Sequence, residues 1–175
     1  MPRVFTLGII VPFLKNPTLN PHDTGSFRPI ALSATLAKLF ECLIMPEDKA
    51  CYNQYGFRQG RSTSMPSSFL HDVTAYFKSQ KTPLHVSSLD AEKCFDRIWH
   101  PGLLYKLIPI LPACQWVFLF KWYSSLHAVV KWNGRYSRMF SVSRGTRQGS
   151  ILSPVLFNIF INDLWKVLKS LHIVS

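Results

Sequence analysis

The sequence predicts a mixed protein of the α+β class, and three observations support that prediction. Strand-like and helix-like segments are interspersed along the 175 residues without a regular βαβ alternation. Hydrophobic residues make up 47% of the chain, which is enough for one ordinary core or for two small subdomains that share one. No repeat, low-complexity block or clear linker divides the chain. We therefore expect helices packed around β structure in a globular arrangement.

The first half of the chain is expected to begin with β structure and to continue into two helices. Residues 4–14 have the composition of one or two strands, and the Pro, Asn and Gly residues of 16–26 predict an exposed loop. A helix is expected within residues 29–44, with Ser33 as a candidate N-cap. Its apolar positions at helical spacing are Leu32, Leu36, Leu39, Phe40 and Leu43. A second helix is expected over residues 66–78.

The second half alternates short elements with one long helix. Residues 84–89 have the pattern of a short, mostly buried strand, and residues 103–108 and 116–126 have the pattern of helices. Asn133-Gly134 lies between two β-rich runs and predicts a hairpin, because a type I′ turn needs positive φ at both central residues. Residues 154–171 begin with a proline and repeat apolar side chains as one long amphipathic helix.

The charge of the chain favours a polyanionic partner. Lys and Arg total 20 against 9 Asp and Glu, which gives a net charge of +11 and a pI near 9.8. Nucleic acid is the first partner to consider, although an ordinary basic protein has the same totals.

Cysteine spacing and hydropathy exclude other classes. The four cysteines form no C-x-x-C pair and have no histidine at zinc-finger spacing, so neither a zinc site nor a disulfide framework is predicted, and a reducing compartment is expected. The longest apolar runs are shorter than the roughly 18 residues that a membrane span needs. Pro12 interrupts the apolar start of the chain, which argues against a signal peptide.

The segment SLDAEKCFDRIWH places Asp90 and Asp96 among apolar neighbours, where a carboxylate needs a partner. Asp90 is either an N-cap for a turn that begins at Ala91 or a ligand for a hard divalent cation, together with the backbone carbonyl of Ala91. For Asp96, the simpler interpretation is an ion pair in solvent with Lys93 or Arg97. A site for two metal ions would need further oxygen ligands from elsewhere in the fold.

Four blocks carry a family resemblance: FRPIALSATLAKLFE, QYGFRQGRST, SSLDAEKCFDRIWHPGLLYKL and GTRQGSILSPVLFNIFINDL. In this order they closely resemble the reverse transcriptase domain of non-LTR retrotransposons of the LINE and jockey-like type. The resemblance runs from about Ile9 to Leu164, and four ordered blocks are more specific than any single short motif. The RQGSILSP block and Phe95 disfavour a related RNA-directed RNA polymerase.

The resemblance implies a right-hand polymerase fold, of which residues 1–82 would form part of the fingers and residues 83–175 part of the palm. It implies that Asp90 is the catalytic, metal-binding aspartate of motif A, and that Ala91 supplies a carbonyl ligand. Complete relatives use two magnesium ions and extend a DNA primer with deoxynucleotides on an RNA template. They work inside the cell, in the cytoplasm, the nucleus or both. The oligomeric state is not predicted.

The resemblance also implies contacts with substrates. The residues expected at the incoming nucleotide are Lys15, Arg28, Ala91, Phe95, Gln148 and Gly149, and those expected to line a cleft for nucleic acid are Arg58, Arg61, Arg144 and Arg147. Phe95 would exclude a sugar 2′-hydroxyl by its bulk, although a core aromatic is the alternative. Lys15 could equally lie in a solvated loop, Gln148 in a plain helix-entry turn, and the arginines in solvent.

Departures from the family pattern limit what is expected of this chain. Cys94 replaces the alanine of the family's AFD triplet, and residues 41–56 form a shorter segment than is usual. The YADD tetrad of motif C, with the remaining catalytic aspartates, is not in the sequence, and Glu92, Asp96 and Asp163 are the only nearby acidic alternatives. We expect no polymerase activity from the chain alone, with apolar surface exposed. The alternative function is a non-catalytic nucleic-acid-binding fragment or an element remnant.

Overall fold

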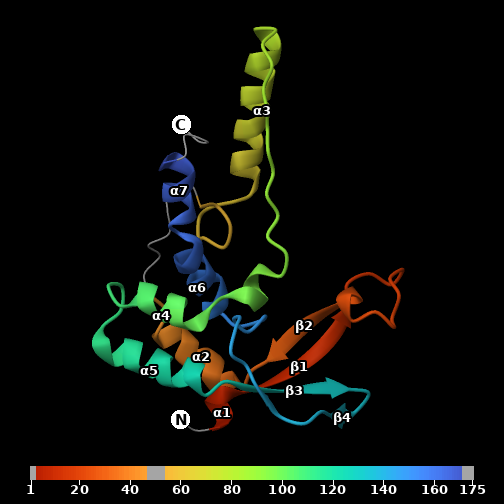
Figure 1. The fold of residues 1–175 in the computed structure, drawn as a ribbon, viewed down its shortest axis with the longest axis vertical. Helices are drawn as coiled ribbons and strands as arrows, with labels where there is room; N and C mark the ends of the chain where they lie inside the picture. Colours follow the sequence, from red (N-terminus) through yellow and green to blue (C-terminus); the bar gives the residue numbers. More distant parts are fainter. Residues whose placement is uncertain (1–2, 47–53, 171–175) are drawn as a thin grey trace.

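The computed structural model describes residues 3–46 and 54–170 of the chain, and it confirms a mixed α and β fold. The elements in chain order are α1 (Arg3–Thr6), β1 (Leu7–Leu14), the 3-10 helix η1 (Thr24–Ser26), β2 (Phe27–Leu32), α2 (Thr35–Leu43), α3 (Ser64–Ser79), the 3-10 helix η2 (Cys94–Arg97), α4 (His100–Leu107), α5 (Ala113–Ser124), β3 (His127–Trp132), β4 (Arg135–Tyr136), β5 (Phe140–Ser141), α6 (Leu152–Ile161) and α7 (Leu164–Ser170). A strand lobe lies beside a helical lobe, and α3 projects from both (Figure 1).

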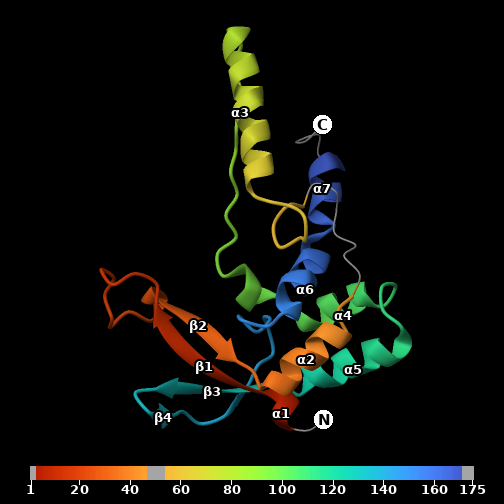
Figure 2. The same cartoon turned by 180° about the vertical axis from the view of Figure 1, so that it is seen from behind.

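The strand lobe is built on one mixed sheet with the order β2-β1-β3-β4, and β5 also pairs with β3. β1 runs antiparallel to β2, with Pro12 opposite Pro29, and parallel to β3, with Gly8 opposite Ala128. The lobe extends away from the helices as one slab (Figure 2). Residues 4–14 were expected to form strands throughout, but the chain makes a helical turn over α1 before β1 begins at Leu7.

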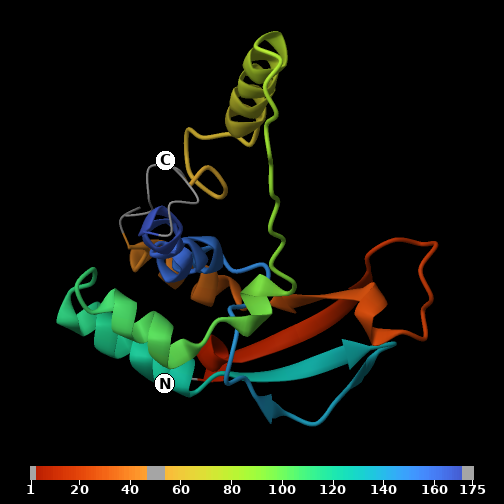
Figure 3. The same cartoon turned by 45° about the horizontal axis from the view of Figure 1, so that its top comes forward.

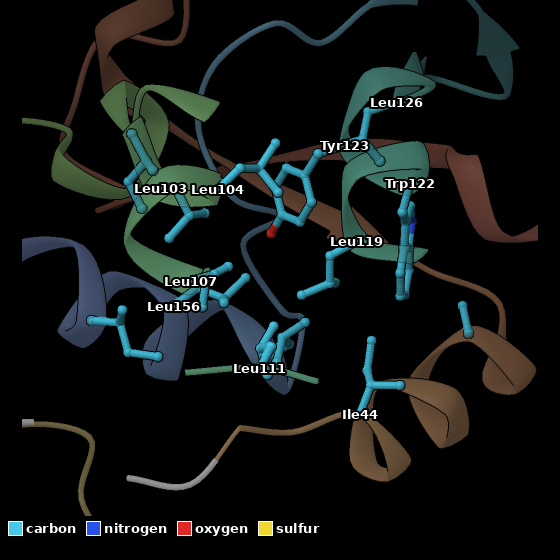
Figure 4. Close-up of a cluster of buried hydrophobic side chains, with 14 residues drawn as sticks. Ile44, Leu103, Leu104, Leu107, Leu111, Leu119, Trp122, Tyr123, Leu126 and Leu156 are labelled. Atoms are coloured by element: carbon cyan, nitrogen blue, oxygen red, sulfur yellow. The ribbon is translucent and has the colours of Figure 1, made fainter. Parts of the chain in front are cut away.

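The helical lobe contains the core, to which α2, α4, α5 and α6 contribute apolar side chains. Leu103 and Leu107 of α4, Leu119 of α5 and Leu156 of α6 are fully buried in one cluster (Figure 4). The helices expected at 103–108 and 116–126 are confirmed, and each begins three residues earlier than predicted. Burial of several leucines against one another is the main stabilising contribution here.

The predicted helix at 29–44 is corrected at its start. Residues Phe27–Leu32 form β2 because their backbone pairs with β1, so the helix begins only at Thr35. Ala34, not Ser33, occupies the N-cap position, and the hydroxyl of Ser33 is buried without a hydrogen bond among the described residues. Leu36, Leu39 and Leu43 of the predicted apolar stripe are exposed to solvent, whereas Phe40 packs against the core beside the buried Ala37 and Glu41.

The expected buried strand at 84–89 is wrong. The helix expected at 66–78 is confirmed as α3, but none of its residues is buried, and the chain returns beside it to the body of the molecule (Figure 3). Residues 83–91 have no regular secondary structure, and Leu89 is 86% exposed. No described strand lies beside this segment, so its backbone has no ladder of hydrogen bonds that would hold it extended and buried.

The hairpin and the last helix have different outcomes. The hairpin is confirmed, since Asn133 and Gly134 have φ values of 46° and 76° and Trp132 pairs with Arg135. The expected long helix over 154–171 is instead divided into α6 and α7, with a turn at residues 162–163. Residue 171 lies outside the described part.

Large apolar side chains are exposed on α2, α3 and the segment after α3, as expected. No helix among the described residues could cross a membrane.

Candidate functional site

Two segments that are about fifty residues apart in sequence meet at one place, which we call the junction and define as residues 94–98 with residues 144–149. The amide of Gly145 donates a hydrogen bond to the carbonyl of Ile98 at 2.8 Å, and the amide of Thr146 donates to the carbonyl of Phe95 at 2.8 Å. Gly145 has a φ of +84°, and a Cβ there would lie 2.7 Å from the carbonyl oxygen of Asp96. The close approach of the two segments therefore requires glycine at 145.

Gln148 makes hydrogen bonds through both its side chain and its backbone. Its side-chain Nε2 donates to Oδ1 of Asp96 at 2.8 Å, and its backbone carbonyl accepts from the amide of Ala31 in β2 at 2.8 Å. Gly149 has a φ of +99°, and a Cβ there would lie 3.2 Å from the carbonyl oxygen of Ala31. Gln148 and Gly149 thus connect the junction to the edge of the sheet.

The partner of Asp96 differs from the expected one. Lys93 and Arg97 have their charged nitrogens 3.9 and 3.8 Å from the carboxylate of Glu92. Asp96 bonds the amide of Gln148 instead. The interpretation of Asp96 as a solvent ion pair is therefore wrong, because a distant segment of the chain supplies the donor that sequence proximity could not indicate.

A small cavity of about 110 Å³ lies between the sheet and the junction. Its floor contains Gly8, Ile10 and Ala31 from the first two strands, and Arg144 and Gln148 belong to its polar wall. Its other polar lining residues include Asp96, His127 and Arg147, so the cavity combines apolar strand residues with a few polar groups, which is the usual composition of a small ligand site.

Phe95 lies in a half-buried aromatic cluster. Its ring centroid is 5.6 Å from that of Phe57, edge to face, and 4.6 Å from that of Phe157 in α6. Such pairs contribute packing energy beyond simple burial. This geometry supports the core-aromatic interpretation, and contact with a sugar stays a prediction.

Asp90 and Ala91 are exposed in the irregular segment that leads to η2. Lys93, with a φ of 52°, occupies the N-cap position of η2, so Asp90 does not cap this helix. No group of three or more His, Cys, Asp or Glu that could hold a metal ion occurs among the described residues. One carboxylate and one carbonyl suit a hard cation but do not make up a complete site for two ions.

Lys15 and Arg28, which the resemblance places at the triphosphate of the incoming nucleotide, lie away from the cavity. The ammonium group of Lys15 donates to the carbonyl of Gly25 at 2.8 Å and so ties together the ends of the loop between β1 and β2. Arg28 is exposed on β2, and side chains alternate along a strand, so it points to the sheet face opposite to Pro29 and Ala31. Since Pro29 and Ala31 line the cavity, the structure does not bring Arg28 to it.

The four arginines expected in a nucleic-acid cleft have different surroundings. Arg144 is exposed at the cavity. Arg58 donates to the carbonyl of Gln54 at 3.5 Å, and the guanidinium of Arg61 lies 5.2 Å from the ring centroid of Tyr55.

Arg147 is directed into the molecule. Its Nη2 donates to the carbonyl of Thr6 at 2.6 Å, and its Nη1 is buried without a hydrogen bond among the described residues. Burial lowers the pKa of its guanidinium, and the charge of nearby Glu41 opposes this effect. The bond to Thr6 gives Arg147 a structural role, although it also lines the cavity, and a contact with phosphates stays a prediction.

Sequence reasoning missed Glu41, which is only 2% exposed. Its Oε2 accepts from the hydroxyl of Ser150 at 2.8 Å and from the amide of Ile151 at 2.9 Å. Glu41 therefore holds α2 against the start of α6, immediately after the junction. An acidic residue within the apolar run LFECLI was the available signal. Burial, followed by the charge of Glu41, raises the pKa of nearby Tyr123 well above its usual range.

Comparisons with known proteins agree with the resemblance of the four blocks. Residues 14–175 match the family model described as reverse transcriptase (RNA-dependent DNA polymerase). The chain is 33% identical over 174 residues to the probable RNA-directed DNA polymerase from transposon BS and 31% identical over 176 residues to that from transposon X-element, both of Drosophila melanogaster, with 93% of the chain covered each time. It is 29% identical over 154 residues, 82% of the chain, to the RNA-directed DNA polymerase from mobile element jockey of the same species. The chain spans 17 to 19% of the length of these relatives.

Proposed function

Because the chain belongs to the reverse transcriptase (RNA-dependent DNA polymerase) family, we propose that it forms part of the polymerase domain of a non-LTR retrotransposon. In the complete protein this domain copies RNA into DNA, with an RNA template, a DNA primer and deoxynucleotide triphosphates as substrates. Its place of action is inside the cell, in the cytoplasm, the nucleus or both.

The proposed architecture is a right-hand polymerase, with residues 1–82 in the fingers and residues 83–175 in the palm. The pairing of strands in the sheet favours one change to this division, which concerns residues 127–141. Because β3 pairs with β1, and β4 and β5 pair with β3, we infer that residues 127–141 group with the strands proposed for the fingers rather than with the palm. The helical lobe, built largely from α4, α5 and α6, then corresponds to the palm.

One observation carries the proposal: the bond between Asp96 and Gln148 joins the segment of motif A to the loop of Gln148 and Gly149, which by the family resemblance corresponds to motif B. In the proposed assignment Asp90 and the carbonyl of Ala91 contribute ligands to a magnesium site, and the metal supplies charge stabilisation for phosphoryl transfer. Gln148 and Gly149 lie against the incoming nucleotide and the templating base, with Arg144 beside them. The assignment of Lys15 and Arg28 to the triphosphate and of Phe95 to its sugar rests on the family resemblance alone, because the structure gives Lys15 and Phe95 contacts within the protein and leaves Arg28 away from the cavity.

The test is primer extension on an RNA template by a chimera in which this chain replaces the matching segment of the jockey polymerase. Loss of the Asp90 carboxylate should reduce extension at least a hundredfold, roughly the cost of removing one transition-state stabilising group. The control is Asp72→Ala, which removes an exposed carboxylate on α3. An active chimera that extends primers equally well with Asp90→Ala would contradict the assignment.

A second function, nucleic-acid binding without catalysis, is favoured by the incomplete donor set around Asp90. The 175-residue chain should then extend no primer with magnesium or manganese, while it still binds nucleic acid. Template-dependent extension by this chain, lost in Asp90→Ala, would exclude this second function.

A further inference from the structure

Positive charge is concentrated in the strand lobe. Residues 7–32 and 127–149 contain seven Lys and Arg but only Asp23 as an acidic residue, and no Asp or Glu occurs anywhere from residue 97 to residue 162. A surface with so few carboxylates attracts phosphates and offers them little repulsion. Within this lobe the hairpin of β3 and β4 also carries exposed aromatic side chains.

We define the basic ribbon as residues 131–138, and its cross-strand register combines charge with aromatic rings. Lys131 is directly opposite Tyr136, and Trp132 is directly opposite Arg135. Side chains of directly opposed residues lie on the same face, and successive residues alternate between faces. Each face of the basic ribbon therefore presents one cation beside one aromatic ring. The ammonium group of Lys131 lies 5.8 Å from the ring centroid of Tyr136.

These side chains are accessible and held in place. All residues of the basic ribbon are exposed, and Tyr136 is 57% exposed. The amide of Val130 donates to the hydroxyl of Ser137 at 2.9 Å, and the amide of Ser137 donates back to the carbonyl of Val130 at 2.9 Å. The ring of Trp132 contacts that of Phe27 edge to face, with 5.3 Å between centroids. A fixed, exposed ring next to a cation needs little ordering before it binds a ligand.

We propose that the basic ribbon binds single-stranded nucleic acid on both of its faces. On one face a base stacks on Trp132 beside Arg135, on the other face a base stacks on Tyr136 beside Lys131, and Arg138 pairs with a further phosphate. Only unpaired bases expose a face to an aromatic ring, and stacking of this kind tolerates any sequence. The proposal rests on the polymerase function proposed above, and it adds a nucleic-acid contact outside the motifs.

The position of Trp132 connects this surface to the cavity. Ala128, Val130 and Trp132 alternate onto one face of β3, and Ala128 lines the cavity that Arg144 and Gln148 also line. A strand that stacks on Trp132 and pairs with Arg135 on this face therefore leads from the ribbon to the junction, whereas Tyr136 and Lys131 offer a second contact on the opposite face.

The test uses the 175-residue chain and fluorescence anisotropy with labelled uridine RNA and thymidine DNA oligonucleotides of equal length. Arg135→Ala combined with Arg138→Ala should lower the slope of log K against log salt by about 1.4, since each phosphate contact to a single strand contributes about 0.7. The matched control is Lys78→Ala with Lys121→Ala, which removes the same charge from exposed positions on α3 and α5 and should leave the slope unchanged.

Stacking is tested by a second pair of variants. Tyr136→Ala should weaken binding at least about fivefold, and Tyr136→Phe, which keeps the ring, should restore it. A loss on RNA alone, on DNA alone or on both supports the proposal and identifies the strand. If the parent chain binds and all variants bind equally well, the ribbon proposal is overturned while the proposed polymerase function stands. If the parent chain shows no salt-dependent binding to either oligonucleotide, the ribbon proposal and the second function, nucleic-acid binding without catalysis, both fail, and the polymerase assignment is decided separately by primer extension with the chimera.

Discussion

The junction and the projection, which we define as residues 64–91, differ in where their backbone groups find partners. At the junction, the amides of Gly145 and Thr146 donate to the carbonyls of Ile98 and Phe95, and the glycine at 145 allows the two segments to approach. In the projection, α3 satisfies its own backbone, but among the described residues no backbone bond involves residues 83–91. The difference teaches that the motif segments have a defined local structure only where a distant part of the chain meets them.

The largest expected effect of this difference is on amide hydrogen exchange. The amides of Gly145 and Thr146 should exchange about a thousandfold more slowly than those of residues 84–91, because they open only with a large part of the fold. Exchange measured by mass spectrometry or NMR on the 175-residue chain checks this. Equal protection of the two segments would contradict this difference in backbone hydrogen bonding.

A glycine-to-alanine substitution at the junction should destabilise the protein more than the same substitution in an open loop. Gly145→Ala should lower the free energy of unfolding by about 3 kcal/mol, because it adds steric overlap with the Asp96 backbone to the cost of a positive φ. Gly60→Ala is the matched control, since Gly60 has a φ of +72° with no atom within 4 Å of its Cβ position, and about 1 kcal/mol is expected. Urea unfolding measures both, and equal losses would contradict the close contact at Gly145.

The smallest effect is a pH dependence that belongs to the junction. His100 is buried, its Nε2 donates to the carbonyl of Gly145 at 2.7 Å, and burial lowers the pKa of its ring despite this bond. The unfolded chain then binds more protons near pH 6, so stability is fully present above about pH 6.5 and is lost as the pH falls below it.

The loss should be at most about 1.4 kcal/mol for each pH unit, measured as urea unfolding at pH 7.5 and 5.5. His100→Gln should reduce this pH dependence, whereas His71→Gln on the exposed α3 should retain it. A pH dependence that His100→Gln leaves intact would assign the effect to another group.

Elements with a local cause were predictable. The Asn133-Gly134 turn follows from two residues that tolerate positive φ, and α4 and α5 follow from apolar spacing within a few turns. The errors concern context: residues 84–89 have the composition of a strand without a neighbouring strand, and Leu32 has helical spacing but pairs with β1. The turn between α6 and α7 interrupts an apolar pattern that continues unchanged through it.

For the candidate site, too, the sequence indicated some residues but not the contacts between distant segments. The four ordered blocks indicated the family and singled out Asp90, Gln148 and Gly149. They did not indicate that Asp96 binds Gln148, that Arg147 faces inward to Thr6, or that Glu41 holds the start of α6. Each of these contacts joins residues more than fifty positions apart, and no spacing rule reaches that far.

The sequence by itself determined the family, the α+β class, the positive charge and the local turns and helices, because each depends on residue types and short spacings. Only the tertiary structure decided which carboxylate holds Gln148, which arginines face solvent and which face of α2 is buried. The physical reason is that a buried polar group must find a partner, and the fold alone determines which distant donor or acceptor lies within hydrogen-bonding distance.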